Sequence, residues 1–388
     1  MGAVNITLAN GQLGGTLQTN DGICGMVLTA APDGGGYALG TCLILHGMAD
    51  VAAAGITVGD NRFVMKQLQE FYNEAGEGAT LYFVGVANTL TVADMADNTN
   101  PAGAKALLDF ANGKIKMLGI MSDDEEVTVP GVDGINDDCY NAMTNMVVMA
   151  AAYFAAQSPF RCIIGGTSYS GTASDLSDMT DGTTFNRVAI LIGDTDAIVS
   201  RKHAALGLVL GRLSTLPVQR KLSRVRTGPM TNAHAYLGNT EIESTGGDLA
   251  TITSLGYITW KTFPHLAGYY MNGDNTCTAT TDDYRFLARG RVIDKGHALA
   301  YSVFVQEVDD EVPVNADGTI DSGFAKWLQQ QIINTINTAM VGNKEVSGVD
   351  CFIDPAQNIL ATNTLNVVLK IRTVGYASDI EISLGFEA

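Results

Sequence analysis

The segment best suited to chemistry is glycine-rich and follows an apolar run: Gly165-Gly-Thr-Ser-Tyr-Ser-Gly171. A serine in a tight turn after a strand is the nucleophile of many acyl-transfer enzymes, and a glycine-rich turn before a helix can bind phosphate. Ser168, however, has Gly166 two residues before it but Ser170 two residues after it, and the segment holds no lysine. The pattern favours a strand-to-loop turn. A hydrolase-like enzyme with a site near 165–171 is kept as an alternative.

The other residue types that support catalysis or metal binding are scattered. Histidine occurs five times, with no HExxH or HxH spacing, at His46, His203, His234, His265 and His297. Acidic and amide side chains cluster near two glycines, at Asp133, Asn136, Asp137 and Asp138. Their spacing does not match a calcium loop, which needs a glycine at its sixth position and a glutamate at its end. We expect a helix cap and a solvated turn there, and no catalytic, cofactor-binding or metal-binding residue.

The six cysteines contain no CxxC pair and have no histidine at metal-ligand spacing. We expect buried free thiols. The sequence starts without the basic segment and apolar stretch of a signal peptide, which predicts folding in a reducing cytoplasm. The most apolar stretch, residues 146–156, is about half as long as a span of the bilayer core requires, so we expect a buried helix and no direct membrane insertion.

Composition predicts a folded chain with more than one core. The chain has 388 residues, of which 46% are hydrophobic and 16% charged, so two domains with large cores are expected. The formal net charge is −18, and such a surface repels the phosphate backbone of nucleic acids. No nucleic-acid partner is expected.

The elements that would carry these residues first alternate between strand and helix. Short apolar runs of strand length lie at residues 81–86, 115–121, 160–165 and 187–193. Helical patterns lie at residues 101–112 and 140–157, and a further helix starts at Asp60. Such alternation is typical of a mostly parallel sheet between helices. We therefore predict a three-layer αβα domain of the α/β class over residues 21–228.

After Gly228 the pattern changes. Strand-like pieces at residues 258–263, 298–305 and 365–371 surround one periodic helix from Ser322 to Met340. The apolar face of that helix holds Phe324, Trp327 or Leu328, Ile332, Ile336 and Met340. This pattern predicts a smaller α+β C-terminal domain over residues 229–374, with both tryptophans, Trp260 and Trp327, in cores.

The opposite face of the same helix is polar and carries little charge. Its side chains are those of Lys326, Gln329, Gln330, Asn334 and Asn337. Amide groups can form many weak hydrogen bonds to another protein without a large desolvation cost. The pattern is also typical of a solvent-exposed face.

Both ends of the chain carry alternating apolar residues where polar, frayed sequence is usual. At the start these residues are Val4, Ile6 and Leu8, and at the end they are Ile380, Ile382, Leu384 and Phe386. A period of two is typical of a strand with one buried face. Two placements fit. Each strand closes a sheet of its own chain, or it extends to the sheet edge of another molecule, where backbone hydrogen bonds would hold it.

Positive charge is concentrated in one stretch. Residues 197–240 contain no Asp or Glu but several cations, among them Arg212, Arg220, Lys221, Arg224 and Arg226. Charge segregation of this kind favours contact between identical copies, with acidic groups such as residues 123–126 and 309–311 on the opposing surface. A solvated basic helix end or an anion site would give the same pattern.

Several segments together resemble the sheath proteins of contractile phage tails and related contractile injection systems. They are Gly211–Arg226, Gly268–Gly273, Asp283–Lys295, Val346–Asp350 and Ile353–Asn358. The resemblance covers about the last 180 residues well and the α/β domain by pattern only. These segments are most similar to a divergent branch of that family.

The resemblance implies a structural subunit, not an enzyme, that polymerises helically and drives tube ejection by contraction. Its partners would be other copies of the same chain, arranged in stacked rings, together with an inner tail tube protein and baseplate and tail terminator proteins. Residues 1–20 and 375–388 would be exchange arms, the helix Ser322–Met340 would face the tube, and Arg212, Arg220, Lys221, Arg224 and Arg226 would contact the next ring. The particle would be a virion tail or an injection device assembled in a bacterial cytoplasm. Another phage tail or baseplate structural protein is the second alternative.

Overall fold

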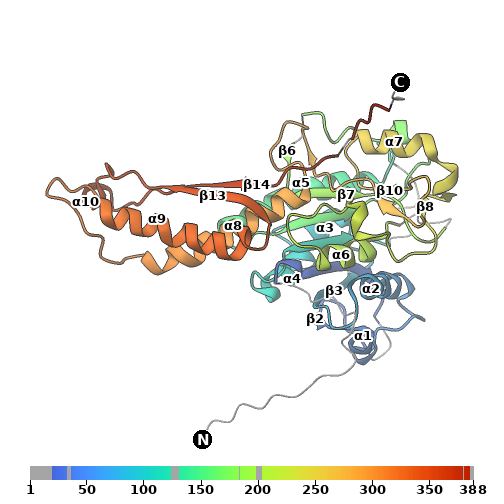
Figure 1. The fold of residues 1–388 in the computed structure, drawn as a ribbon. Helices are drawn as coiled ribbons and strands as arrows, with labels where there is room; N and C mark the ends of the chain where they lie inside the picture. Colours follow the sequence, from blue (N-terminus) through green and yellow to red (C-terminus); the bar gives the residue numbers. More distant parts are fainter. Residues whose placement is uncertain are drawn as a thin grey trace, which may run out of the picture. The chain divides into compact units, whose positions relative to one another are not determined.

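The structure is a computed structural model that describes residues 20–32, 36–123, 131–182, 184–197, 203–378 and 380–384 (Figure 1). The chain divides into two compact units, residues 1–291 (unit 1) and residues 292–388 (unit 2). The division falls within the helix α8 (Leu287–Phe304).

Unit 1 is built on a six-stranded sheet with the strand order β2-β3-β1-β4-β5-β7. The strands are β1 (Cys24–Ala30), β2 (Cys42–Leu45), β3 (Leu81–Ala87), β4 (Met117–Met121), β5 (Arg161–Gly165) and β7 (Val188–Leu191). Neighbouring strands are parallel, except that β2 runs antiparallel to β3. The four strands predicted from apolar runs are confirmed as members of this sheet. Its central strand, β1, is buried along its whole length and was not foreseen.

The helices of unit 1 pack against this sheet in two groups. They are α1 (Met48–Ala53), α2 (Arg62–Ala75), α3 (Val92–Ala96), α4 (Ala104–Ala111), α5 (Asp137–Ala155) and α6 (Leu206–Thr215). In one group α2 and α6 contact each other and β1. In the other, α3 contacts both α4 and α5, and these helices contact strands from β1 to β7. The helices predicted from Asp60 and at residues 101–112 and 140–157 correspond to α2, α4 and α5.

Two glycines allow α6 to approach α2 closely. A side-chain carbon at Gly207 would lie 1.9 Å from the carbonyl oxygen of Gln67, and one at Gly211 would lie 2.6 Å from that of Phe71. The buried side chain of Gln67 fills the contact: its Oε1 accepts the N–H of Gly207 at 2.7 Å, and its Nε2 donates to the carbonyl of Ala204 at 3.1 Å. Any larger residue at these glycines would push the two helices apart.

A buried ion pair holds the last turn of α6 to the end of α2. The guanidinium of Arg212 pairs with the carboxylate of Glu74, and both side chains are almost fully buried. Arg212 also donates to the carbonyl oxygens of Gly228 and Pro229, and Glu74 accepts the N–H of Thr231 at 3.0 Å. The pair therefore joins both helices to the chain that follows residue 227.

Unit 1 extends beyond the boundary expected at residue 228. The extra elements include β8 (Tyr236–Leu237), β9 (Thr240–Glu241), α7 (Gly246–Ser254), β10 (Trp260–Lys261), β11 (Tyr270–Met271) and β12 (Cys277–Thr278). Ile258 forms a parallel bridge with Leu191 at the edge of the main sheet, and β12 pairs with β6 (Thr184–Phe185). The strand-like piece at 258–263 therefore belongs to the first core, where Trp260 is buried as expected.

Unit 2 contains a helix packed on a two-stranded antiparallel sheet (Figure 1). The sheet is formed by β13 (Val346–Phe352) and β14 (Val368–Thr373), and the short helix α10 (Ile359–Thr362) lies between them in the chain. The predicted late helix is α9 (Ser322–Ile336), which continues as a turn of π-helix over Asn337–Val341. Its first turn is capped by Asp321, which accepts the N–H of Phe324 at 2.9 Å.

The strand expected at residues 298–305 is wrong, because this segment is the second half of α8. Its eight residues fit both a strand and a helix, and the upstream turns of α8 continue into it. Gly296 lets this part of the helix lie against β14, since a side-chain carbon there would be 2.3 Å from Cδ1 of Ile371.

Replacing Arg212 with Met should destabilise unit 1 by about 3–5 kcal/mol, because it leaves the carboxylate of Glu74 buried without its cation. Urea unfolding followed by circular dichroism measures the change. The matched control is Arg220→Met, at an exposed position, which should alter the free energy of unfolding by no more than about 0.5 kcal/mol. Equal effects of the two variants would contradict a structural role for Arg212.

The native protein should expose at most one reactive thiol. All six cysteines are free, as expected, and five of them are buried, the exception being Cys42. Burial raises the pKa of Cys24 to about 12 and that of Cys139 to about 11, so their thiolate forms are scarce at pH 8. Titration with a chromogenic disulfide at pH 8 should detect no more than Cys42 quickly, and all six thiols in denaturant. Rapid reaction of three thiols in the native state would contradict the burial.

Candidate assembly surfaces

The C-terminal segment after β14 exposes apolar side chains. Ile380, Ile382 and Leu384 are 76%, 81% and 94% exposed, and residues 380–384 form no strand pairing within the described part of the chain. Three uncovered aliphatic side chains at every second position are typical of a strand that is buried in a complex. Phe386 and the N-terminal residues Val4, Ile6 and Leu8 lie outside the described residues.

Among the described residues, no strand pairs with either outer edge of the sheet of unit 2. Within the described residues β13 and β14 pair only with each other, from Val346 opposite Thr373 to Phe352 opposite Val368. A two-stranded sheet uses one hydrogen-bonding edge of each strand, so the outer edges of both strands have no strand partner. Strands of seven and six residues are long enough to accept added strands by β-augmentation.

The exposed face of α9 differs from the predicted polar face at two positions. Lys326, Gln330, Asn334 and Asn337 are exposed as expected. The prediction that Gln329 belongs to this face is wrong. Its side chain is 6% exposed, and its Nε2 donates to the carbonyl of Ile353 at 3.3 Å. The reason is geometric, because each residue turns the helix by about 100° and Gln329 falls on the stripe that carries Leu328 and Ile332.

Trp327 lies on that exposed face, and the prediction that it belongs to a core is wrong. Its side chain is 46% exposed, and its ring lies 5.4 Å from that of Phe324. Leu328 fills the core position instead. The signal was present in the spacing, since buried positions at Ala325, Leu328 and Ile332 place residue 327 on the other side of the helix. A half-exposed tryptophan among amides is a common anchor for a protein partner.

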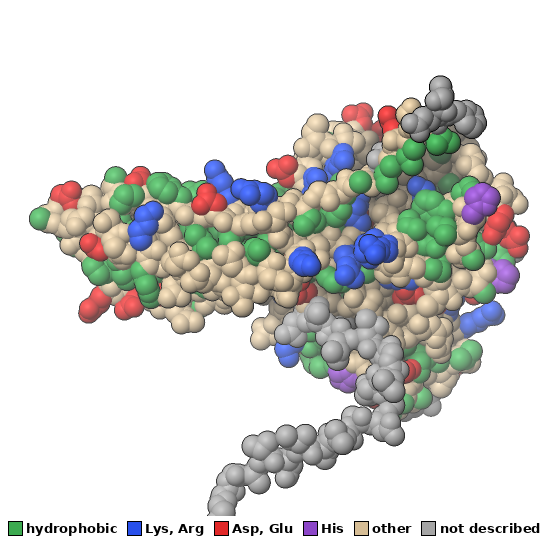
Figure 2. Space-filling view, in the orientation of Figure 1, with side chains coloured by type: hydrophobic (Ala, Val, Ile, Leu, Met, Phe, Trp, Pro, Cys, Tyr) green, Lys and Arg blue, Asp and Glu red, His purple; other side chains and the backbone are tan. Residues whose placement is uncertain are grey.

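The five basic residues assigned to one contact surface do not all reach the surface. Arg212 is wrong in this role, because it is buried in the ion pair with Glu74. Lys221 is largely buried, with its Nζ 3.7 Å from Oδ1 of Asp274. Arg220 and Arg226 are exposed, and Arg224 is half-buried. Figure 2 shows Lys and Arg side chains gathered on one face of unit 1, near the position of α6 in Figure 1.

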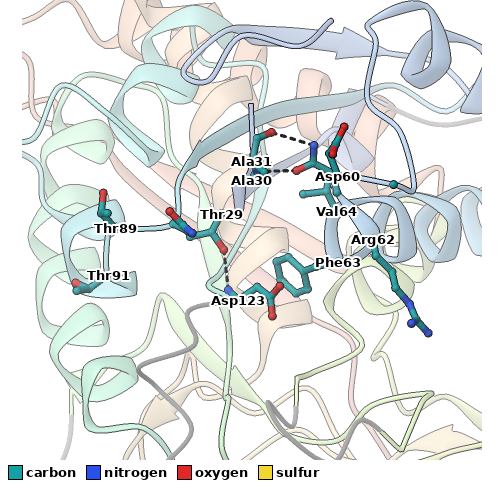
Figure 3. Close-up of a pocket in the computed structure, with 13 residues that line it drawn as sticks. Thr29, Ala30, Ala31, Asp60, Arg62, Phe63, Val64, Thr89, Thr91 and Asp123 are labelled. Atoms are coloured by element: carbon teal, nitrogen blue, oxygen red, sulfur yellow. Dashed lines mark hydrogen bonds between the residues drawn. The ribbon is translucent and has the colours of Figure 1, made fainter. Parts of the chain in front are cut away.

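A cavity of about 650 Å³ opens at the carboxyl ends of β1, β3 and β4 (Figure 3). It is lined by Thr29, Ala30, Ala31, Gly59, Asp60, Asn61, Arg62, Phe63, Val64, Asn88, Thr89, Thr91 and Asp123. Open α/β sheets bind ligands at this position. The side chain of Asn61 does not cap α2. Its Oδ1 accepts the N–H of Ala31 at 2.7 Å, and its Nδ2 donates to the carbonyl of Ala31 at 2.9 Å. No sequence motif marked this cavity.

One charged residue of the cavity lining, Asp123, contacts two other parts of the chain. Asp123 donates its N–H to the hydroxyl of Thr29 at 2.7 Å, and its Oδ1 lies 2.7 Å from Nε2 of the buried His203. The ring of His203 also packs on that of Phe63, with centroids 4.6 Å apart. These contacts join the end of β4 to α2 and to the chain that leads into α6.

The segment 165–171 forms a structural turn. Ser168 is buried and has a positive φ of 58°, and the hydroxyl of Ser170 donates to the carboxylate of Asp175 at 3.1 Å. Around residue 136 the expected helix cap is confirmed: Asn136 accepts the N–H of Asp138 at the start of α5. Among the described residues no group of His, Cys, Asp and Glu is placed to hold a metal ion, and no helix there is long and apolar enough to cross a bilayer.

Solved structures of contractile particles have the same fold. The chain is similar to chains in the anti-feeding prophage baseplate (TM-score 0.64, 13% identity, 100% of both chains covered) and in the contracted anti-feeding prophage helical sheath (TM-score 0.60, 13% identity, 99% of this chain and 98% of that chain). A chain of the contracted PVC sheath complex, from an extracellular contractile injection system, matches with a TM-score of 0.58 and 10% identity over 99% of this chain and 97% of the other.

The sequence comparisons identify a family. No curated protein matches the chain significantly. Residues 1–275 match the family described as DUF2586, N-terminal domain, and residues 283–388 match DUF2586, C-terminal domain. With a mostly parallel six-stranded sheet, a C-terminal helix-and-hairpin unit, and both halves of the family pattern in order, the chain belongs to the DUF2586 family.

Proposed function

We propose that this protein is the structural subunit of a contractile tail sheath, which polymerises helically around an inner tube and drives tube ejection by contraction. The observation that carries the proposal is a complementary pair of features in one chain: the uncovered apolar segment 380–384 and the two free edges of the β13–β14 sheet. The fold shared with sheath and baseplate chains supports the same role.

The segment and the sheet edge would satisfy each other between copies. A strand added to β13 or β14 would pair the backbone groups of the outer edge, and every second side chain would fall on one face of the extended sheet. Full burial of an aliphatic side chain contributes about 1.5–3 kcal/mol, so three such residues give each exchanged arm a substantial binding energy. In this proposal residues 1–20 and 375–388 are the two arms.

Contraction would be a rigid-body rearrangement of the stacked subunits. The α/β domain, with helices on both sides of its sheet, would move as one body, and the arms would keep neighbouring copies connected while their flanking segments absorb the change in backbone angles. Arg220, Arg224 and Arg226 would face acidic groups of the next ring. Arg212 would not take part, because its side chain is buried in the ion pair with Glu74.

The exposed face of α9 would contact the inner tube. Trp327 and the polar side chains of Lys326, Gln330, Asn334 and Asn337 form this surface. Baseplate and tail terminator proteins would be the partners at the two ends of the cylinder. The particle would be a virion tail or a contractile injection device assembled in a bacterial cytoplasm. A baseplate subunit is the second candidate, because a baseplate chain shares the fold over its full length.

Removal of residues 375–388 should abolish polymerisation and leave a folded monomer, because the cores of both units lie outside this segment. Removal of residues 1–10 should have the same effect. Negative-stain microscopy and sedimentation of the purified protein report the assembly state, and circular dichroism reports the fold.

A matched pair of point variants separates strand exchange from a general effect of charge. Ile382→Asp should prevent assembly, whereas Ser383→Asp should be tolerated, because successive residues of a strand face opposite sides. Cylinders of normal length from the Ile382→Asp variant, or from a chain without residues 375–388, would contradict the proposal.

Trp327→Ala should reduce co-sedimentation with the inner tube protein and leave the urea midpoint nearly unchanged, because the side chain is half exposed. Gln329→Ala should do the reverse. It removes a buried hydrogen bond to Ile353, which costs about 1 kcal/mol of stability, and it touches no exposed surface. Tube binding that depends on Gln329 and not on Trp327 would contradict the assignment of this face.

A further inference from the structure

Three cations surround one aromatic ring where α8 begins. The Nζ of Lys221 lies 3.5 Å from the ring centroid of Phe286, and the guanidinium carbons of Arg285 and Arg289 lie 4.6 and 5.4 Å from it. We call Lys221, Arg285 and Arg289 the cationic cluster. Phe286 itself is buried, so its ring holds the three positive charges at a fixed spacing.

The two arginines of the cluster have no carboxylate partner among the described residues. Lys221 pairs with the carboxylate of Asp274, which is buried and also accepts the N–H of Ala288 at 3.0 Å. Within the described part of the chain, Arg285 and Arg289 donate to neutral carbonyl oxygens, those of Thr280 at 2.9 Å and Asp283 at 3.4 Å. The start of a helix adds further positive potential. Arg285 and Arg289 therefore carry their charges beside a helix N-terminus without an ion pair among the described residues.

Two details of the cluster favour the binding of an anion. The Nε of Arg289 is buried and has no hydrogen-bond partner among the described residues. Burial lowers the pKa of Lys221, and the charges of Arg285 and Arg289 lower it further, while Asp274 acts in the opposite direction. An anion bound beside these residues would relieve the repulsion among them.

The opposite excess of charge follows the other end of the same helix. After α8 ends at Phe304, the chain carries Glu307, Asp309, Asp310 and Glu311, and there is no Lys or Arg from Gly296 to Ala325. We call residues 307–311 the acidic segment. None of its four carboxylates has an ion pair among the described residues, and the adjacent Val305 and Val308 are 42% and 67% exposed.

We propose that the acidic segment of one copy of this chain binds the cationic cluster of a second copy. Guanidinium groups bind carboxylates through paired, charge-assisted hydrogen bonds, and the exposed valines add apolar contact beside them. Because each copy carries both the basic and the acidic site, it can donate one and accept one, which gives a head-to-tail contact. The inference rests on the proposed function, since stacked rings bring identical copies together.

An acidic peptide fits the cluster better than a nucleic acid. The formal net charge of −18 opposes a polyanion that extends over the surface, whereas a short acidic segment needs only the local excess of positive charge.

A peptide titration tests the contact without any assembly. A labelled peptide of residues 304–313 is added to the full chain at low salt, and fluorescence anisotropy is recorded. We expect binding that weakens with salt and that falls about tenfold or more in the Arg285→Gln/Arg289→Gln variant. The control Lys370→Gln/Arg372→Gln changes two exposed cations of β14 and should bind as the native chain does. Circular dichroism checks that each variant is folded.

Three results of the titration would overturn the inference: no binding of the peptide, equal binding by the Arg285→Gln/Arg289→Gln variant, or equal binding of a peptide with Asn and Gln in place of Asp and Glu. A single-stranded oligonucleotide that binds the cluster more tightly than the peptide would also overturn it and would indicate a phosphate site.

A charge exchange tests the pairing between copies. The Arg285→Glu/Arg289→Glu variant and the Asp310→Lys/Glu311→Lys variant should each lose self-association in sedimentation, and their equimolar mixture should regain it. A mixture that stays dissociated refutes the pairing. If the peptide binds but the native chain never forms cylinders, the sheath proposal fails and the contact stands. If cylinders form and the peptide does not bind, the contact fails and the sheath proposal stands.

Discussion

A β-strand has two hydrogen-bonding edges, and each strand of unit 2 uses one of them within the described residues. This constraint decides how the rest of the chain is interpreted. An isolated two-stranded sheet is marginal in water, and here its stability depends on α9, which packs against β13. The outer edges remain available, and the apolar segment 380–384 supplies side chains with the right alternation to be buried on such an edge. Sheet edge and segment together are the two features on which the proposal of an assembling subunit rests.

The parts of the fold that the sequence predicts are those where burial is uniform. The strands β3, β4, β5 and β7 are apolar on both faces, so their runs are visible without knowledge of the partner. β1 is equally buried and was not predicted, and it contains Gly25. That glycine is required because a side-chain carbon there would lie 2.7 Å from Cδ1 of Ile115. A requirement set by a residue ninety positions away has no local signal.

The errors at the candidate surfaces have a related cause. Nearly every residue of α6 is buried, so its sequence gives no amphipathic pattern from which to tell that Arg212 faces Glu74. The helical period places Gln329 on the buried stripe of α9, and the carbonyl of Ile353, a partner that the sequence does not reveal, accepts its hydrogen bond there. Trp327 was assigned by residue type, whereas its position in the helix places it outside. Charge and polarity along the chain locate such residues, but tertiary contacts decide which of them are exposed.

The state of the six cysteines has a mechanical consequence. Five thiols are buried inside single chains, so they are out of reach of a neighbouring copy. A cylinder built from these chains would thus be joined by hydrogen bonds, apolar packing and charge, with no permanent cross-links among those five sites. Such joints can slip and re-form as a lattice changes its pitch, and a reducing environment would leave their strength unaltered.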